Sequence, residues 1–445
     1  MTMTTYSIIQ KSQLEGALRL DAEYYQPEYL ELIKKLDSLG VVSIKAIAEL
    51  IKRKFKPEEN KFFDYIEIAE VDLETGEYNT QKIIGKEAPD RAQWTVEKND
   101  VLISTVRPIR NAIVLVKEKK ENLVCSSGFA VLKPIKISPQ YLFIYLKTKS
   151  IIKLLDRLTT ASMYPAITLD DVLNTKIYLG EKFFRDEISK FVDETFHLLE
   201  NSKSLYSQAE NLLLEKLGLK DFEGEDDLSY IINLLEINKS HRADAEYFQP
   251  KYDKLISKIR KSKIKLLSDL VSIKKGIEIG SDQYQEEGKL FIRVSSLSRQ
   301  GLIEKDQKYL SEELYQKLKK DFEPEVGEIL LTKDATPGIA YNLKEPIKGI
   351  IAGGILRLKI KEKIEPEYLT LVINSIVGQA QIERDTGGSV IIHWRPEQIK
   401  TCLIPILPKS IQQKITDLVH QSHGARKKAK ELLQQAKTKV ENLIK

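Results

Sequence analysis

The chain carries one sequence module twice, and this duplication constrains its fold more than any other feature. Residues 21–29 read DAEYYQPEY and residues 244–252 read DAEYFQPKY, with seven of nine positions identical. An arginine stands two places upstream of each copy, at Arg19 and Arg242. Because self-similarity at a long, constant offset marks repeated structural units, we expect two domains of one fold related by an internal pseudo-two-fold repeat.

Further matches extend the duplication over most of the chain. EKNDVLIS from Glu97 matches EVGEILLT from Glu325, and SSGFAVLKPIKISPQYL from Ser126 parallels AGGILRLKIKEKIEPEYL from Ala352. Near the end of each copy, TASMYPAITLDDVLNTKIYL from Thr160 corresponds to GGSVIIHWRPEQIKTCLIPI. The two modules therefore have the same order of parts.

The composition is that of a folded protein. A chain of 445 residues has room for about two to four domains. Hydrophobic residues make up 42% and charged residues 30%, which supports substantial cores. No stretch approaches the ~18 apolar residues of a membrane span, and the N-terminal residues do not resemble a signal peptide. We therefore expect a cytoplasmic protein with no membrane partner.

The front part of each module is rich in short β-branched runs. They are YIEIAEV, DVLIST and AIVLV in the first module and FIRVSS, EILLT and GILRLKI in the second. Turn residues such as Thr75 with Gly76 and Pro337 with Gly338 separate them. This pattern predicts a compact β-rich domain with short flanking helices in each module, and hence an α+β fold class.

The rear part of each module has a heptad pattern, in which apolar or small residues alternate at spacings of four and three. The first seam is predicted at Phe184, Ile188, Phe191, Thr195, Leu198, Ser202, Leu205, Ala209 and Leu212. The second seam is predicted at Ile411, Ile415, Leu418, Ser422, Ala425, Ala429, Leu432 and Ala436. A narrow apolar stripe must be buried, so we expect the two long helices to form an antiparallel coiled coil. Packing of each helix on its own globular domain is the alternative.

A paired core of about thirty residues would be ~45 Å long at ~1.5 Å per residue. This exceeds one turn of B-DNA, ~34 Å, and would separate the two β-rich domains. The predicted boundaries are 1–180 for the first domain, 181–217 for its helix, 218–243 for a linker, 244–407 for the second domain and 408–445 for its helix.

The sequence contains no motif that predicts catalysis. It has no G-x-x-x-x-G-K-[ST] loop, no G-x-G-x-x-G after a strand and no G-x-S-x-G elbow. It also lacks the Asn/Asp-Pro-Pro-aromatic tetrapeptide of enzymes that methylate a base amino group. Cys125 and Cys402 show no ligand spacing and are predicted to be core residues, and the five histidines are scattered. We therefore expect neither catalytic residues nor a metal site.

Several of these motifs together resemble the specificity (S) subunit of type I DNA restriction-modification enzymes, over essentially the whole chain. They are the DAEYYQP and DAEYFQP openings, the NDVLIS and GEILLT strands, and the passage TTGGSVIIHWRPEQIKTCLIPILPKSIQQKI. That passage is similar to the family's glycine-serine loop, which leads into Ile-Pro-x-x-Pro and a helix. The first copy departs from the pattern, with Tyr178, Leu179 and Gly180 before its helix.

The resemblance implies a non-catalytic subunit with two target recognition domains, each reading one part of a bipartite, asymmetric site in double-stranded DNA. The long helices would set the gap between the parts and dock two modification (methyltransferase) subunits. Restriction (translocase and nuclease) subunits would be further partners. No cofactor would be bound by this chain, because S-adenosylmethionine, ATP and Mg²⁺ would belong to the partner subunits.

Candidate DNA-reading residues lie in loops beside the matched strands, and Arg107 and Asn111 are the strongest of them. Arginine can bind guanine, and asparagine adenine, with two hydrogen bonds. In the first module the candidates are Ser104, Arg107, Arg110 and Asn111. In the second they are Arg293, Ser295, Ser296, Arg299, Lys333, Asp334, Thr336, Ser389, His393, Trp394 and Arg395.

Three other interpretations stay open at this point. A coiled-coil scaffold whose β-rich ends bind proteins would show no sequence-dependent DNA binding. An enzyme with unrecognised carboxylates would show metal-dependent activity as an isolated chain. The aromatic pairs Tyr24 with Tyr25 and Tyr247 with Phe248 could stack on bases, but their place beside an amphipathic helix favours packing.

Overall fold

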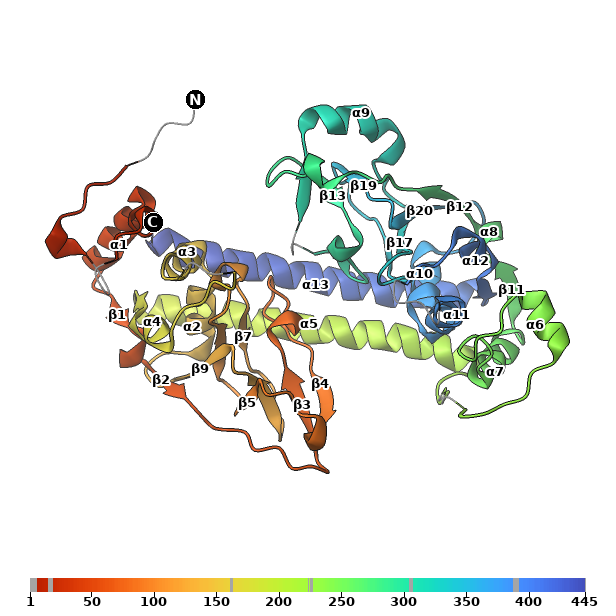
Figure 1. Cartoon of the computed structure of the whole chain (residues 1–445), viewed down its shortest axis with the longest axis horizontal. Helices are drawn as coiled ribbons and strands as arrows, with labels where there is room; N and C mark the ends of the chain where they lie inside the picture. Colours follow the sequence, from red (N-terminus) through yellow and green to blue (C-terminus); the bar gives the residue numbers. More distant parts are fainter. Residues whose placement is uncertain are drawn as a thin grey trace. The chain divides into compact units, whose positions relative to one another are not determined.

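The computed structural model describes residues 6–14, 19–160, 163–222, 224, 227–303, 307–386 and 392–444. It divides into two units, Met1–Leu199 with Lys427–Lys445 and Glu200–Arg426. Each unit contains one copy of the repeat and part of each of two long helices (Figure 1). Within the described ranges, no helix is both long and apolar enough to cross a bilayer.

The first unit contains two four-stranded sheets. The antiparallel sheet has the order β2-β9-β6-β7, from β2 (Ala48–Ile51), β9 (Phe129–Pro134), β6 (Val101–Ser104) and β7 (Ile113–Leu115). The other has the order β4-β3-β8-β5, from β4 (Gln81–Ile84), β3 (Phe62–Ile66), β8 (Leu123–Ser126) and β5 (Ala92–Thr95). Strands β3 and β8 are parallel. All residues of β6, β7 and β8 are buried, which explains why these strands are continuous apolar runs.

Helices close the first unit around its antiparallel sheet. Helix α2 (Pro139–Leu146) is buried from Tyr141 to Leu146, and Ser138 caps it by accepting a hydrogen bond from the Tyr141 backbone N–H. The other elements are α1 (Pro27–Ser38), α3 (Lys149–Arg157), α4 (Leu169–Asn174), β1 (Val42–Ser43) and β10 (Lys176–Ile177). Strands β1 and β10 pair antiparallel.

The second unit repeats this plan. Its antiparallel sheet has the order β12-β20-β17-β18, from β12 (Val271–Lys275), β20 (Ile355–Ile360), β17 (Ile329–Thr332) and β18 (Ala340–Asn342). Its other sheet is β16 (Lys308–Leu310), β13 (Lys289–Ile292) and β19 (Gly349–Ile351), with β13 and β19 parallel. The matching helices and strand pair are α7 (Pro250–Ile259), α10 (Pro366–Asn374), α11 (Ile376–Thr386), α12 (Pro396–Thr401), β11 (Lys263–Leu266) and β21 (Leu403–Ile406). The shared strand order confirms the predicted internal repeat.

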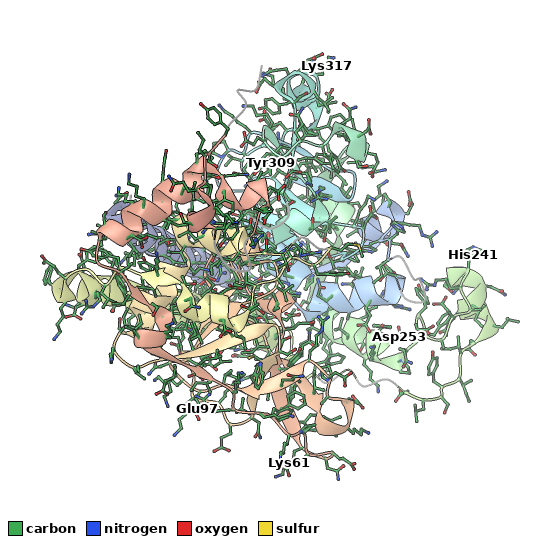
Figure 2. All side chains as sticks on the ribbon, turned by 60° about the vertical axis from the view of Figure 1, so that its left-hand side comes forward. Lys61, Glu97, His241, Asp253, Tyr309 and Lys317 are labelled. Atoms are coloured by element: carbon green, nitrogen blue, oxygen red, sulfur yellow. The ribbon has the colours of Figure 1, made fainter. Side chains whose placement is uncertain are left out.

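The second unit also has elements of its own. Helix α9 (Glu312–Phe322) follows β16, whereas the matching strand β4 is followed by the three-residue 3₁₀ helix Gly85–Glu87. Figure 2 labels Lys317 in α9 and Tyr309 in β16. Ser311 caps α9 by accepting a hydrogen bond from the Leu314 backbone N–H. The other short elements of this unit are α6 (Leu234–Ser240), α8 (Leu267–Leu270), β14 (Leu297–Ser298), β15 (Gly301–Leu302) and the 3₁₀ helices Ser281–Gln283 and Val294–Ser296.

The two long helices, α5 (Lys182–Lys216) and α13 (Lys409–Ile444), pack against each other within each unit. In the first unit Lys439 pairs with Glu187 at 2.8 Å and Lys428 pairs with Glu194 at 3.3 Å. From Glu187 to Glu194 the residue number rises in α5 while that of its partner in α13 falls from Lys439 to Lys428, so the two helices are antiparallel. In the second unit the hydroxyl oxygens of Ser202 and Ser422 are 3.1 Å apart. The predicted antiparallel coiled coil is confirmed.

Every second residue of the predicted seam is wrong, because the buried residue is the next one along the chain. Where Phe191, Leu198 and Leu212 were expected, the buried residues of α5 are Val192, Leu199 and Leu213. The same shift by one residue occurs in α13, where Val419, Arg426 and Leu433 replace Leu418, Ala425 and Leu432. The seam residues Ile188, Thr195, Ser202, Ala209, Ile415, Ser422, Ala429 and Ala436 are buried as predicted. The shift leaves the spacings of four and three intact, so the heptad period holds.

Candidate functional site

In the first unit, two segments far apart in sequence meet beyond the end of β6. Val106 and Ala166 form an isolated antiparallel bridge. The Arg107 backbone N–H donates to the Pro165 carbonyl at 2.7 Å, and the Ile167 N–H donates to the Thr105 carbonyl at 2.9 Å. The loop that follows β6 and the segment that precedes α4 therefore form one site.

Arg107 lies at the centre of this site. Its backbone is left-handed, with φ 49°, and begins the short 3₁₀ helix Pro108–Arg110. Its guanidinium donates to the Met163 carbonyl at 3.4 Å and lies 5.3 Å from the ring centroid of Tyr164. The side chains of Met163 and Tyr164 are 87% and 67% exposed, and Arg110 is exposed as well. The site thus combines a half-buried cation with an exposed apolar and aromatic surface.

Met163 and Tyr164 were not among the predicted residues. The sequence contained a signal for them, because the repeat aligns this segment with the predicted segment around His393. Taking the whole segment aligned with Ser389–Arg395 as a candidate, and not only the positions opposite the named residues, would have included both.

The side-chain amide of Asn111 is partly buried and contacts the protein. Its Nδ2 donates to the Lys147 carbonyl at 3.4 Å, and Lys147 Nζ donates to the carbonyls of Asn111 at 3.3 Å and Leu73 at 2.9 Å. The Oδ1 atom is buried and accepts no hydrogen bond from any described residue. Burial lowers the pKa of Lys147 to about 7. We conclude that Asn111 supports the loop in this conformation, in contrast to the expectation that it reads a base.

The second unit builds the same two-segment site at the matching place. Asp334 after β17 forms an isolated antiparallel bridge with His393. The Ala335 N–H donates to the Ile392 carbonyl at 3.0 Å, and the Trp394 N–H donates to the Lys333 carbonyl at 2.8 Å. Three predicted residues, Lys333, Asp334 and His393, are thereby brought together.

Their side chains form a chain of charge-assisted contacts. His393 Nδ1 is 2.7 Å from Asp334 Oδ1, and Lys333 Nζ pairs with Asp334 Oδ2. The exposed fractions are 11% for Lys333, 22% for Asp334 and 59% for His393. Burial alone would raise the pKa of Asp334, but the hydrogen bonds from His393 and Lys333 outweigh it and lower that pKa. Asp334 is therefore a carboxylate at neutral pH.

A third candidate segment, after β13, lies next to this loop. A side chain added at Gly354 would approach Val294 to 2.8 Å and Asp334 to 3.4 Å, so the two loops converge on this glycine. The Arg293 guanidinium lies 5.8 Å from the ring centroid of Tyr284. The exposed candidates in and beside these loops are Ser295, Arg299, Thr336 and Arg395.

Three predicted residues are buried, and their burial removes them as candidates for direct base contact. Ser104 is 2% exposed and its hydroxyl donates to the Val106 carbonyl at 2.8 Å, closing the turn after β6. Ser296 is fully buried. Trp394 is 1% exposed, and its Nε1 donates to Asp385 Oδ2 at 3.1 Å, so it anchors the core. Ser389 lies outside the described residues.

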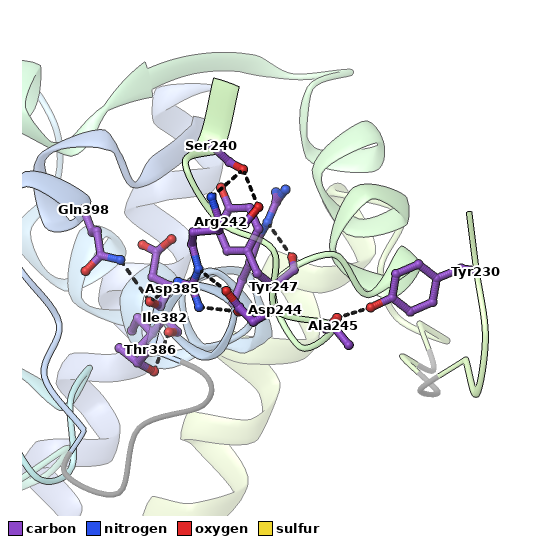
Figure 3. A network of polar contacts seen from close by, with 11 residues as sticks. Tyr230, Ser240, Arg242, Asp244, Ala245, Tyr247, Ile382, Asp385, Thr386 and Gln398 are labelled. Atoms are coloured by element: carbon purple, nitrogen blue, oxygen red, sulfur yellow. Dashed lines mark hydrogen bonds and ion pairs between the residues drawn. The ribbon is translucent and has the colours of Figure 1, made fainter. Parts of the chain in front are cut away.

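A polar network holds the base of the site in the second unit (Figure 3). Arg242 Nε donates to Asp244 Oδ1 at 2.8 Å, and its Nη1 donates to the Asp385 carbonyl at 2.7 Å. Gln398 Nε2 donates to the same carbonyl at 2.9 Å. Asp385 is in the last turn of α11, so the network fixes the point from which the chain runs toward His393.

The first unit has the same network. Arg19 bonds Asp21 at 2.9 Å and donates to the Leu158 and Thr159 carbonyls, each at 3.3 Å. The ring of Tyr24 lies between Arg19 and Arg157, at 4.2 Å and 3.7 Å from the two guanidinium carbons.

The aromatic pairs of the duplicated motif pack as predicted. Tyr24 and Tyr25 are 4% and 5% exposed, and Phe248 is 8% exposed. The motif Arg-x-Asp-Ala-Glu-Tyr is therefore a structural clamp, which explains its near-identity in the two copies.

The described residues include no group of three or more His, Cys, Asp or Glu side chains that could hold a metal ion. Both cysteines are free core residues, as predicted. Burial raises the pKa of both thiols, to about 12 for Cys402.

The sequence matches one family model twice, over residues 37–210 and 259–437, and the model is described as the type I restriction modification DNA specificity domain. A comparison with curated proteins found no match. Among solved structures, the HsdS subunit from Thermoanaerobacter tengcongensis is 18% identical, with 91% of this chain and 95% of that chain covered and a TM-score of 0.33. The S subunit of a type I restriction-modification system from M. genitalium is 14% identical, with 91% and 94% covered and a TM-score of 0.40.

Proposed function

Because the chain belongs to the type I restriction-modification DNA specificity family, we propose that each unit reads one half of a bipartite, asymmetric sequence in double-stranded DNA. The observation that carries this proposal is the two-segment site, which has the same backbone bridge in both units and different side chains on it. Two unlike half-sites need unlike reading groups on a common framework.

The available side chains suit this task. In the first unit Arg107 and Arg110 supply donors for guanine edges or phosphates, and Tyr164 supplies an exposed ring. In the second unit the donors and acceptors beside the site are Arg293, Ser295, Arg299, Lys333, Asp334, Thr336, His393 and Arg395. Each base-reading pair is worth about 1–3 kcal/mol of discrimination.

We further propose that the coiled coil of α5 and α13 sets the gap between the half-sites and docks two modification subunits. Those subunits would bring S-adenosylmethionine, and restriction subunits would bring ATP and Mg²⁺. The chain itself would act in the cytoplasm without catalysing a reaction, as is general for this family.

The proposal is tested by assembling the full chain with its modification subunits and mapping the methylated positions in randomised DNA. We expect one split sequence to be methylated, and none by the chain alone. The Arg107→Ala variant should relax one half-site by about 1–3 kcal/mol, or up to about a hundredfold, and leave the other unchanged. Methylation without sequence preference in the assembled complex, or sequence preference supplied by the modification subunits alone, would refute the proposal.

A further inference from the structure

The contact with Asp334 sets the tautomer of the neutral His393 ring. Its Nδ1 lies 2.7 Å from Asp334 Oδ1. An ionised carboxylate can only accept hydrogen bonds, so Nδ1 carries the proton and donates it. In the neutral imidazole the other nitrogen, Nε2, is then a hydrogen-bond acceptor.

Several contacts fix the geometry of the pair His393 and Asp334. The backbone bridge between Asp334 and His393 fixes the distance between their main chains. Lys333 engages the second carboxylate oxygen, so Asp334 cannot rotate without losing a partner. His393 nevertheless remains 59% exposed. The Nε2 acceptor therefore belongs to an exposed ring whose position is fixed.

We propose that His393 Nε2 accepts a hydrogen bond from the exocyclic amino group of adenine or cytosine in the major groove, with Asp334 as its positioning residue. This inference rests on the proposed function and names the chemistry of the second half-site. Guanine and thymine present carbonyl oxygens at that place in the groove, and these cannot donate.

Phosphate is a poor partner for the same nitrogen. A phosphate oxygen accepts hydrogen bonds and so requires a donor, whereas neutral Nε2 offers a lone pair. The first unit has Val106 and Ala166 at the bridged positions, and neither side chain can form hydrogen bonds. This mode of reading therefore belongs to one half-site only.

The experiment uses the full chain assembled with its modification subunits at pH 8. Motif mapping with His393→Ala first identifies the position that loses its base preference. The amino group of that base is then replaced by hydrogen, as purine for adenine or pyrimidin-2-one for cytosine. We expect wild-type affinity for this DNA to fall about tenfold, the effect of about 1.4 kcal/mol from one hydrogen bond. The His393→Ala complex should bind both DNAs equally.

Variants of Asp334 distinguish its role in positioning His393 from a role in folding of the chain. Asp334→Asn keeps an oxygen that can accept from Nδ1–H and should retain the base preference. Asp334→Leu cannot accept and should match His393→Ala in specificity. The control is His241→Asn, which removes an exposed imidazole at a left-handed position that asparagine tolerates, and it should leave both half-sites unchanged.

The outcomes distinguish this inference from the proposed function. If Arg107→Ala relaxes one half-site but His393→Ala relaxes no position, the inference is overturned and the proposed function stands. An equal loss of affinity for the analogue DNA in the wild-type and His393→Ala complexes also overturns it. If the wild-type complex shows no sequence preference at all, the proposed function itself fails.

Discussion

Protonation of one half-buried histidine, His423, is coupled to the stability of the second unit. His423 in α13 has its Nδ1 3.0 Å from Lys344 Nζ, and its ring centroid lies 6.1 Å from that of Tyr341. Burial, and after it the positive charge of Lys344, lowers the pKa of His423 to about 4, although the charge of Glu367 opposes this. The folded state therefore holds this imidazole neutral and lets it accept from the lysine.

We expect this group to make stability fall as the pH drops from about 6.5 to about 4. The unfolded chain binds a proton at the ordinary pKa of about 6.5, whereas folded His423 stays neutral down to about 4. The loss from this one group is about 3 kcal/mol at the acid end of the window. Urea unfolding between pH 7 and pH 4 measures it, with His423→Gln as the comparison because glutamine can accept from Lys344 without titrating. Equal pH slopes in the two proteins would contradict the assignment.

The sequence predicted which loops hold the residues of the site, but not which of their side chains are buried. The match between the two copies identified the loops after β6 and β17, in which Arg107 and Asp334 lie. Nothing local in the sequence indicates that Asn111 turns inward, because its partner Lys147 lies 36 residues further along the chain. The repeat pointed to the segment around Met163, but no local signal indicated its hydrogen bond with Arg107, which spans 56 residues.

At the level of elements, the period of the coiled coil was predictable and its exact face was not. Adjacent apolar pairs such as Leu198 with Leu199 and Leu212 with Leu213 make the stripe two residues wide. A sequence alone cannot tell which member of each pair points at the partner helix. Arg426 takes a seam position and is 7% exposed, which no hydrophobic pattern predicts.

The clamp at the start of each module makes a prediction at this scale. Replacing Arg242 with methionine removes its hydrogen bonds to Asp244 and to the Asp385 carbonyl, which fix the end of α11. We expect about a tenfold loss of discrimination in the second half-site, equivalent to about 1.4 kcal/mol, and none in the first. Arg19→Met should do the reverse. Motif mapping with the assembled complex measures both effects.

The conservative variant serves as the control. Arg242→Lys keeps the charge but not the bidentate geometry, so it should restore discrimination only in part. A purely structural role predicts a lower melting temperature with equal loss in both half-sites, and that result would contradict a positioning role.

At the scale of the whole molecule, the two copies share their framework but differ in the side chains on their bridged segments. The clamp, the sheet order and the heptad period are alike in both units. The side chains on the bridged segments differ completely, with Val106 and Ala166 in one unit and Asp334 and His393 in the other. A duplicated framework with altered loops provides two unlike binding sites on one fold, which is consistent with the general location of function in loops.

The proposed spacer role leads to a prediction about the DNA itself. Duplicating residues 196–202 in α5 and residues 423–429 in α13 adds one heptad to each helix and keeps the seam in register. Seven residues add about 10.5 Å at ~1.5 Å per residue, or about three base pairs at ~3.4 Å each. Motif mapping should therefore show both half-sites unchanged and the gap between them about three base pairs longer.

Two matched insertions test whether the helices cause this change. Inserting three residues in each helix breaks the heptad register, exposes seam residues such as Val192 and Leu433, and should abolish methylation. Inserting seven residues at Gly224, in the segment between the modules, adds chain but no helix and should leave the gap unchanged. A gap that follows the insertion at Gly224, or that ignores the added heptads, would mean that the linker and not the coiled coil measures the distance between the half-sites.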